Sequence, residues 1–384
     1  MLETWFWVLL VAGLYPYVIY PVCVAVLGRL VNRGVRADAG YLPRVTVITA
    51  AYNEQAHIEA TVRNKLTQDY PRELLDMIVV SDCSADGTDD IVRRIAAEDA
   101  RVQLLRNETR SGKTIGLNLA LPRARGDIVV FADANSIYRP DAIAKIVRNF
   151  ADERVGYVTG NMLYVNPDGS LVGDGCSAYM RYENALRAAE NRLGSIVGVD
   201  GGVDAIRREL YRPMRADQLP DFVTPLNVSE QGYRVIYEPA AVLTEDALSE
   251  QSQEYRMRVR VALRAFWALW DKRALLNPFR FGLFAWQLWS HKLLRYLAFA
   301  PLTAAMILNW MLLDHGAIYA LGAAAQVLFA AACGVAAAGS RTTGAAFAPV
   351  RYCFYFFLLN WASAVAFVRF VRGQKQVLWQ PRTG

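Results

Sequence analysis

Two kinds of hydrophobic pattern divide this chain. In its middle part, short runs of aliphatic residues alternate with stretches in which hydrophobic residues recur at helical spacing. Toward both ends, hydrophobic residues form long runs without any charge. The first pattern predicts an α/β domain and the second predicts membrane helices. The composition agrees, because 54% of the 384 residues are hydrophobic and the mean hydropathy is +0.15.

Four uncharged runs are candidates for membrane helices. The first, Thr4–Gly28, is long enough to cross about 30 Å of hydrocarbon, and no basic residue precedes it, which argues against a cleavable signal peptide. Three more follow near the C-terminus: Tyr296–Leu313, Gly316–Ser340 and Tyr352–Val368. The last is short, so a re-entrant or surface-lying segment is the alternative for it.

Basic residues next to these runs indicate orientation. Arg29, Arg33 and Arg36 follow the first run, whereas Glu3 precedes it. By the positive-inside rule, the domain after this run faces the cytoplasm. Three C-terminal spans would then place the C-terminus outside, but the basic residues beyond the last run favour the inside. The sequence leaves this conflict open.

The middle part predicts strands that alternate with helices. The strands are Val45–Thr49, Leu74–Ser81, Val102–Leu105, Asp127–Phe131 and Val155–Gly160. The helices are Gln55–Gln68, Asp86–Ala97, Gly112–Leu121 and Pro140–Phe150. This alternation is typical of a mostly parallel, Rossmann-like sheet with helices on both faces. Such sheets bind ligands at the carboxyl ends of their strands.

Polar residues follow the first four predicted strands. They are Asn53 and Glu54, Asp82 and Ser84, Arg106 and Asn107, and Asp133 and Asn135. The carboxylate and amide of the last pair are oxygen ligands of the kind that a hard divalent cation prefers, and a diphosphate would complete its coordination. Lys113, at the start of a predicted helix, is placed to meet phosphate. No GxGxxG or GxxxxGK[ST] motif is present, which disfavours a dinucleotide or P-loop site.

Charge and composition exclude other classes of function. The net charge of +6 is modest, and much of it flanks the hydrophobic runs, which favours contact with membrane lipids over nucleic acid. The five cysteines are scattered without metal-type spacing, as a reduced cytoplasmic setting permits. The three histidines form no cluster, so zinc chemistry is not expected.

Three motifs in order carry a family resemblance. They are Ala51-Tyr52-Asn53-Glu54, then Ser81-Asp82-Cys83-Ser84-Ala85-Asp86-Gly87-Thr88, then Asp133-Ala134-Asn135. Together they resemble glycosyltransferase family 2, which has the GT-A fold. The hydrophobic runs on both sides resemble the membrane-embedded branch that holds bacterial poly-N-acetylglucosamine, hyaluronan and cellulose synthases.

The resemblance implies roles for residues around a nucleotide-sugar donor. Tyr52, Asn53, Glu54 and Asp82 would form the nucleotide pocket, with Asp82 bonding a uracil base. Asp133 would bind Mg²⁺ or Mn²⁺ on the donor diphosphate. Asn135 stands where the family usually has a second Asp, so a weaker metal site is expected. Lys113 matches the lysine of a family GKxxALN segment near the donor.

The resemblance also implies a catalytic base. In the related synthases, the base lies upstream of a strand end that matches Tyr237-Glu238-Pro239, and that register selects Asp221 in Leu219-Pro220-Asp221. The literal family triplet Thr244-Glu245-Asp246 makes Asp246 the alternative. The plain structural alternative for Asp221 is a carboxylate at a turn or helix start.

Two further motifs bear on the acceptor and on processivity. The related synthases carry a QxxRW motif, and its register falls here on Met257-Arg258-Val259-Arg260-Val261, where only Arg260 matches. A shifted register with Arg264 and Trp267 is the alternative. Arg260 is expected to contact the donor diphosphate, although this arginine-rich helix fits a membrane surface equally well. Asp200, Gly201 and Gly202 fall where the family has a small-residue loop beside the acceptor.

The predicted organisation follows from these assignments. A membrane helix (1–30) precedes a GT-A domain (40–255), amphipathic interfacial helices (256–292), C-terminal membrane helices (293–370) and a tail (371–384). The expected protein is a multi-pass enzyme of a bacterial-type inner membrane, with its catalytic domain in the cytoplasm. It would be an inverting, metal-dependent glycosyltransferase of the hexosyltransferase class that uses a UDP-sugar.

The acceptor is open between a growing exopolysaccharide and a lipid-linked acceptor, as in a non-processive glycolipid-forming enzyme. A transporter with a nucleotide-sensing domain is a rival class, which the absence of charge within the four runs disfavours. An inactive scaffold subunit is another. The sequence does not identify protein partners.

Overall fold

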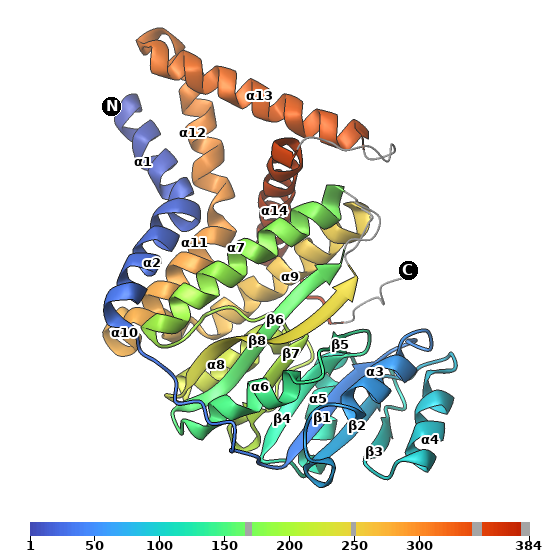
Figure 1. Ribbon diagram of the computed structural model, residues 1–384. Coiled ribbons are helices and arrows are strands. Elements are labelled where there is room, and N and C mark those ends of the chain that lie inside the picture. The colour runs from blue at the N-terminus through green and yellow to red at the C-terminus, as the bar shows by residue number, and fades with distance from the viewer. Residues whose placement is uncertain (166–170, 247–250, 340–347, 378–384) are drawn as a thin grey trace. The chain divides into compact units, whose positions relative to one another are not determined.

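The computed structural model describes residues 1–165, 171–246, 251–339 and 348–377. It divides the chain into two compact units (Figure 1). The helical unit contains the described parts of Met1–Leu27, Tyr164–Ala189 and Asp246–Lys375. The sheet unit contains Gly28–Leu163, Glu190–Glu245 and the described C-terminal residues Gln376 and Val377. Each unit is therefore assembled from segments that are far apart in the sequence.

An eight-stranded sheet is the core of the sheet unit, in the order β3-β2-β1-β4-β7-β6-β8-β5 among the described residues (Figure 1). The strands are β1 Val45–Ala51, β2 Leu75–Ser81, β3 Val102–Arg106, β4 Ile128–Asp133, β5 Ile137–Tyr138, β6 Val155–Val165, β7 Val203–Arg207 and β8 Arg234–Asp246. Central strands are covered on both faces, since Val47, Ile48 and Ile128 are fully buried. Their continuous aliphatic composition is typical of such strands.

The sheet is mixed, which corrects the expectation of a mostly parallel sheet. β1 pairs in parallel with β2 and β4, and β2 with β3. β7, however, runs antiparallel to both β4 and β6, and β5 runs antiparallel to β8. Hydrophobic patterning indicates that a strand exists but not its direction, and the short β5 and β7 were not predicted. The direction of β7 places its amino end beside the carboxyl end of β4, with Val203 opposite Ala132.

Within the described part of the sheet unit, five helices follow strands. They are α3 Ile58–Leu66, α4 Thr88–Glu98, α5 Lys113–Ala120, α6 Ala142–Val147 and α8 Pro220–Glu230. The first four confirm the predicted helices, although each is shorter than its prediction. α3 and α5 each contact β2, and they also supply side chains that hold loops at the strand ends.

The helical unit is formed by helices from three parts of the chain. They are α1 Leu2–Leu14, α2 Tyr20–Val31, α7 Leu171–Leu193, α9 Gln251–Asp271, α10 Pro278–Gln287, α11 Leu294–Leu297, α12 Phe299–Met311, α13 Ala317–Gly339 and α14 Ala348–Val371. A π-helical segment, Tyr15–Ile19, joins α1 to α2 and contains Pro16. α9 packs on α14, where Phe266 is buried with Ala362 and Ala366. Phe266 is therefore enclosed by other side chains of the helical unit.

Within the described residues, three helical segments are long and apolar enough to cross a membrane: Leu2–Val31, Ala317–Ala337 and Pro349–Val371. Two of them match predicted runs, and the third is longer than its run because the helix continues through Arg351. The predicted Tyr296–Leu313 run belongs to a pair of helices bent by 53° that qualify only together. The end of the predicted Gly316–Ser340 run, at Ser340, lies outside the described residues.

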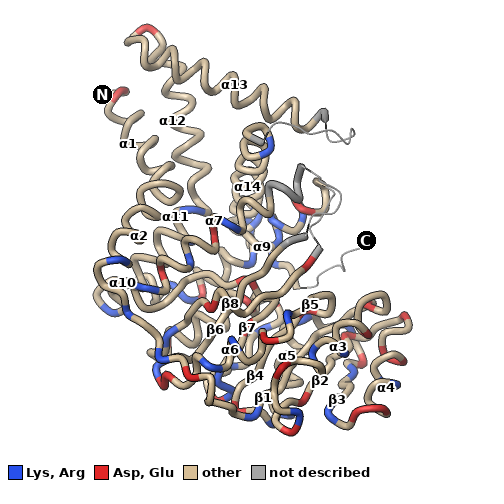
Figure 2. The backbone as a smooth tube through the Cα atoms, in the orientation of Figure 1, with Lys and Arg blue, Asp and Glu red and all other residues tan. Residues whose placement is uncertain are grey.

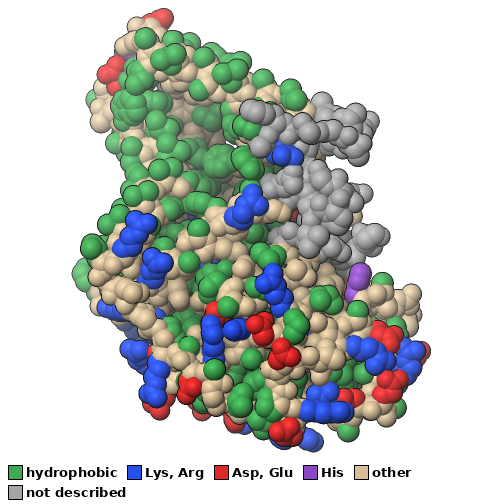
Figure 3. All heavy atoms as spheres, viewed as in Figure 1, with side chains coloured by type: hydrophobic (Ala, Val, Ile, Leu, Met, Phe, Trp, Pro, Cys, Tyr) green, Lys and Arg blue, Asp and Glu red, His purple; other side chains and the backbone are tan. Residues whose placement is uncertain are grey.

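The surface of these helices suits a hydrocarbon environment. Figure 2 shows few charged residues along α12 and α13, and Figure 3 shows hydrophobic side chains gathered over them. Leu321 and Leu328 on α13 are each 70% exposed. Exposure of so much aliphatic surface costs free energy in water but not in lipid.

Buried ion pairs lie inside the helical unit. Glu183 accepts hydrogen bonds from Arg295 and from His291, whose Nε2 lies 3.1 Å from the carboxylate. Burial opposes its charge, but Arg295 and His291 outweigh that effect and hold the pKa of Glu183 well below its usual range. A second buried pair lies on α9, where Glu254 accepts a hydrogen bond from Arg258 at 2.7 Å.

Candidate active site

One ammonium group joins two carboxylates at the centre of the candidate site. Lys113 Nζ donates to Asp133 Oδ1 at 2.8 Å and to Asp221 Oδ1 at 3.1 Å. These residues are the first of α5, the last of β4 and the second of α8. The three side chains are 20%, 35% and 28% exposed, so a ligand can reach them. With one cation between two carboxylates, the cluster keeps an excess of negative charge.

The charge of Lys113 is firmly held. Burial alone would favour the neutral amine, but Asp133 and then Asp221 outweigh it and hold the pKa of Lys113 well above its usual range. Asp221 lies in the first turn of α8, where the free N–H groups of the helix favour a negative charge. The alternative assignment of Asp221 to a helix start is therefore correct as a location, and it does not conflict with a catalytic role.

Asp82 organises the loop that leads to Lys113. Its carboxylate accepts hydrogen bonds from the N–H groups of Ser111 at 2.8 Å and Gly112 at 2.9 Å, and from the Asn107 side chain at 3.0 Å. Asp82 is only 1% exposed. The contact of Asp82 with a nucleotide base stays a prediction, because these three hydrogen bonds join Asp82 to the protein.

The loop after β4 is held by side chains of α3. Thr61 Oγ1 donates to the Ala134 carbonyl at 2.7 Å, and the Lys65 ammonium donates to the Ser136 carbonyl. Lys65 is 1% exposed, and burial lowers its pKa to about 7 although Asp133 works in the opposite direction. These contacts fix the backbone between Asp133 and Ser136, and with it the predicted metal ligands.

Asp133 and Asn135 together fit a weakly held divalent cation. Within the described residues, no group of three or more His, Cys, Asp or Glu side chains gathers as a metal cage would require. Mg²⁺ and similar hard cations commonly bind through one or two protein oxygens, with substrate phosphates completing the shell. One carboxylate, one amide oxygen and the excess negative charge of the cluster meet that requirement.

The predicted acceptor loop lies directly against the predicted base. Gly201 has φ +91°, and a Cβ atom there would lie 2.6 Å from Asp221 Cγ. A Cβ on Gly202 would lie 2.6 Å from Met162 Cε. Both glycines are therefore needed for close approach, and Tyr138 fixes the loop by donating to the Gly202 carbonyl at 2.8 Å. The antiparallel course of β7 is what brings this loop to the carboxyl end of β4.

A buried carboxyl group next to this loop was not predicted. Asp204 on β7 is 1% exposed, and neither of its oxygens makes a well-formed hydrogen bond within the described residues. Burial raises the pKa of Asp204 to about 7; the nearby Thr159 and Tyr157 hydroxyls oppose this rise, and Asp221 and Asp200 add to it. The signal available in the sequence was an aspartate inside the hydrophobic run Val203–Ile206.

The motif after β1 is joined to the motif after β2. Asn53 Oδ1 accepts from the Ala85 N–H at 2.9 Å, and the Glu54 N–H donates to Thr88 Oγ1 at 2.9 Å. The Arg110 guanidinium lies 3.7 Å from the centre of the Tyr52 ring, a contact that was not predicted. The predicted nucleotide pocket is thus a set of interlocked loops with an aromatic face and a cation.

Two other predicted residues, Arg260 and Asp246, lie outside the sheet unit. Arg260 lies on α9 in the helical unit. Asp246 is the last residue of β8 and is assigned to the helical unit. At the other edge of the cluster, the Val377 carbonyl lies 3.4 Å from where a Cβ on Gly112 would stand, so the C-terminal segment borders the lysine loop.

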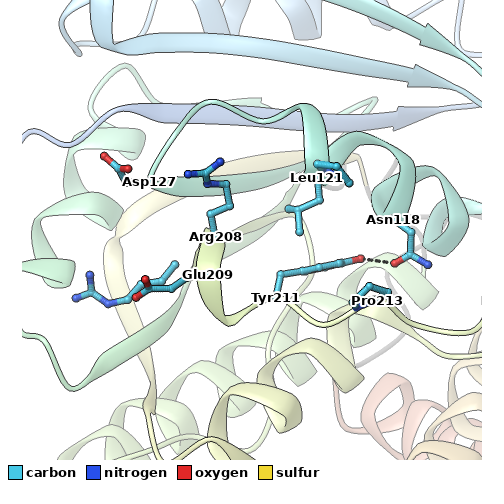
Figure 4. Close-up of a pocket in the computed structure, with 9 residues that line it drawn as sticks. Asn118, Leu121, Asp127, Arg208, Glu209, Tyr211 and Pro213 are labelled. Carbon is cyan, nitrogen blue, oxygen red and sulfur yellow. Dashed lines mark hydrogen bonds between the residues drawn. The ribbon is translucent and has the colours of Figure 1, made fainter.

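A separate cavity of about 500 Å³ lies near the start of β4 (Figure 4). Asn118, Tyr211 and Arg208 are among its lining residues. Since Asp127 also lines it and Asp133 ends the same strand, the cavity is at the opposite end of β4 from the lysine cluster.

Fold and site together define a GT-A-like α/β domain with a mixed sheet. Residues 46–212 match the sequence profile of glycosyl transferase family 2. The chain therefore contains a glycosyl transferase family 2 domain, as its motifs predicted.

Two relatives of the chain are named as synthases of different products. The beta-monoglucosyldiacylglycerol synthase of Trichormus variabilis is 29% identical over 172 residues, which is 44% of this chain and 37% of that protein. The poly-beta-1,6-N-acetyl-D-glucosamine synthase of Staphylococcus aureus is 26% identical over 243 residues, 62% of this chain and 57% of that protein. The chain thus spans less than two thirds of either relative.

A solved structure is similar over nearly the whole chain. It is the mannosyltransferase PcManGT from Pyrobaculum calidifontis, in complex with GDP-Man and Mn²⁺. The two chains are 26% identical with a TM-score of 0.74, and the match covers 97% of this chain and 100% of that one. The similarity therefore includes the hydrophobic helices as well as the sheet.

Proposed function

We propose that this protein transfers a sugar, with inversion, from a nucleoside diphosphate sugar to an acceptor hydroxyl. The observation that carries the proposal is the meeting of Lys113, Asp133 and Asp221 at the carboxyl end of β4, with the Asp200–Gly202 loop against Asp221. This arrangement supplies a phosphate-binding cation, a metal ligand and a base within one accessible cluster. The glycosyl transferase family 2 domain supports the same chemistry.

Asp221 is the proposed general base. Its carboxylate takes the proton of the acceptor hydroxyl while that oxygen attacks the anomeric carbon. The bond from this carbon to the diphosphate oxygen breaks, and the nucleoside diphosphate leaves with the electron pair. Because the acceptor attacks directly from the side opposite the leaving group, the anomeric configuration inverts. A positioned base of this kind contributes roughly 10²–10⁴-fold to the rate.

Asp133 and Asn135 would hold Mg²⁺ or Mn²⁺, which acts as a Lewis acid toward the diphosphate leaving group when bound. Lys113 is placed to exchange a carboxylate partner for phosphate oxygens. In doing so, it would release Asp221 from its ion pair as the donor binds. Arg260 keeps the role that its motif register implies, a further phosphate contact.

The nucleotide base of the donor distinguishes two versions of the proposal. The motif resemblance favours a UDP-sugar, with Asp82 at the uracil. The similarity to a mannosyltransferase in complex with GDP-Man over 97% of this chain favours GDP-mannose as the second candidate. Both donors present a diphosphate to Lys113 and Asp133, so the two versions share one mechanism.

The acceptor is proposed to be a lipid-linked sugar, a glycolipid or a growing exopolysaccharide. Three apolar helices support a membrane location. We place the sheet unit on the cytoplasmic side of a bacterial-type inner membrane, since arginines follow the first apolar run. The altered QxxRW segment favours single transfers over processive synthesis.

A panel of labelled donors tests this function. Membranes carrying the protein are incubated with UDP- and GDP-sugars, with Mn²⁺, Mg²⁺ or a chelator. We expect label to enter a lipid-soluble or polymeric product from one donor only, and only with metal. Extraction into organic solvent separates glycolipid from polymer. Release of nucleoside diphosphate without metal, or no release from any donor, would contradict the proposal.

A further inference from the structure

Helix α5 ties down the chain segment that leads to the proposed base. The Asn118 side chain donates to the Met214 carbonyl at 2.7 Å and accepts from the Met214 N–H at 3.1 Å. Tyr211 also donates to Asn118 Oδ1, at 2.8 Å. One turn earlier on the same helix, Thr114 Oγ1 donates to the Gln218 carbonyl at 2.9 Å. Four hydrogen bonds therefore link one short helix to residues 211–218.

This segment is also held by local contacts: the Gln218 N–H donates to the Arg215 carbonyl at 3.0 Å, and the Met214 side chain is buried. Between η5, Arg208–Leu210, and α8, residues 211–219 contain no regular helix or strand. Figure 4 shows the hydrogen bond between Tyr211 and Asn118 beside Pro213, at the cavity of about 500 Å³. Packing on the cavity side is therefore incomplete. Where packing does not fix a backbone, hydrogen bonds to its N–H and C=O groups must do so.

The same helix also carries the donor side of the site. Its first residue is Lys113, which contacts both Asp133 and Asp221. α5 thus connects the phosphate-binding end of the cluster to the backbone that precedes α8. A shift of the 211–218 segment would move the amino end of α8 relative to Lys113, and Asp221 with it.

We propose that Asn118 is a positioning residue, which sets the location of the Asp221 carboxylate through the backbone of residues 211–218. This inference rests on the proposed function of Asp221 as the base. Asn118 itself lies on the cavity side and touches no proposed substrate group. Its loss should therefore impair the chemical step and leave donor binding intact.

The test compares Asn118→Ala with Asn149→Ala. Asn149 is the control, because its buried amide also donates to backbone carbonyls, those of Lys145 and Ile146, and to Glu238, in another part of the sheet unit. For Asn118→Ala we expect kcat to fall by about 10- to 100-fold, since small misplacements of a reacting group have effects of this size. The donor KM and the binding of nucleoside diphosphate with Mn²⁺ should change less than twofold, because the variant keeps the geometry of the loop at Lys113. Asn149→Ala should retain kcat.

A second variant and a second measurement keep the inference testable. Tyr211→Phe removes one hydrogen bond to Asn118, so a smaller fall in kcat is expected. Hydrogen exchange in the full-length protein should rise in peptides covering 211–221 for Asn118→Ala, and not for Asn149→Ala. Unchanged kcat in Asn118→Ala, or equal falls in both Asn variants, would overturn the inference.

The exchange measurement also separates this inference from the proposed function. If the wild-type protein transfers sugar from no donor, the proposed function fails. Faster exchange in 211–221 would still show that Asn118 fixes this segment, and unchanged exchange would refute the positioning role directly.

Discussion

Charged residues have different surroundings in the two units of this protein. In the sheet unit, Lys113 is shared between Asp133 and Asp221, and all three side chains are partly exposed. In the helical unit, the side chains of Glu183 and His291 are 2% and 1% exposed, and they are hydrogen-bonded to each other. The first group can exchange partners when a ligand arrives, whereas the second cannot do so without unfolding.

The difference separates charges that act on a ligand from charges that specify structure. A buried ion pair gives little net stability, but the loss of one partner leaves an uncompensated charge, which is costly. A partly exposed cluster loses less when one member changes, because water replaces the missing partner. Substitutions in the partly exposed Lys113 cluster should therefore affect activity, and substitutions in the buried Glu183 group should affect stability.

The largest expected effect on activity comes from Asp221→Asn. Removal of the base should lower kcat by roughly 10²–10⁴-fold while nucleoside diphosphate binding is retained. Steady-state transfer and equilibrium binding measure the two quantities. Asp246→Asn is the paired control and should remain active; an inactive Asp246→Asn with an active Asp221→Asn would reverse the assignment of the base.

Glu183→Gln should give the largest loss of stability. Arg295 and His291 would lose the carboxylate to which both are bonded. We expect a destabilisation of about 3–5 kcal/mol, measured by denaturant unfolding in detergent. Glu98→Gln, which removes an exposed ion pair with Arg63, should change the unfolding midpoint little. Equal effects of the two variants on stability would mean that the buried and the exposed ion pairs do not differ in this way.

Asp204→Asn tests a buried carboxyl group within the sheet unit. The pKa of Asp204 is about 7 in the folded protein and about 3.9 in an unfolded chain. Between these values the folded state binds more protons, so the stability of the wild type falls as pH rises from about 4 to about 7. The Asn variant does not titrate there.

Its stability relative to wild type should therefore increase across this window, by on the order of 4 kcal/mol, and level off above it. Unfolding midpoints at pH 4, 6 and 8 measure the trend. Asp99→Asn is the control, because Arg101 lowers the pKa of Asp99 to about 2, so its difference from wild type changes only below about pH 4 and should be flat from pH 4 to 8. A flat difference for Asp204→Asn would mean that this group is ionised throughout.

The smallest expected effect is on metal affinity. Asn135→Asp adds a charged oxygen ligand next to Asp133, so the apparent affinity for Mn²⁺ should increase by roughly tenfold. Electron paramagnetic resonance of free Mn²⁺, with nucleoside diphosphate present, measures this affinity apart from turnover. Unchanged affinity would mean that residue 135 is not a ligand.

Much of the fold could be predicted because its elements are strongly patterned. The aliphatic runs at β1, β2 and β4 are short and rich in β-branched residues, which favours strands, and the uncharged run at α13 has the length of a membrane helix. β5 and β7 were missed, since β5 is two residues long and β7 contains Asp204. The length of α14 was underestimated because Arg351, a charged residue, lies within the helix.

The candidate site was predictable as a set of residue types and not as a set of contacts. Asp133, Lys113, Asp221 and Gly201 were each identified by a motif, and the structure brings them together. Their partners were not identified. Asn118 lies 96 residues from Met214, and no local pattern reports a hydrogen bond over such a separation.

The sequence by itself determined the class of chemistry, because strand-end carboxylates, a helix-start lysine and close-approach glycines are properties of residue type and local order. Only the tertiary structure decided which of these groups meet. The antiparallel course of β7 carries Gly201 to Asp221, and α5 connects Lys113 to the segment before the base. The physical reason is that strand direction and long-range hydrogen bonds depend on how the whole sheet packs, which no short segment of sequence specifies.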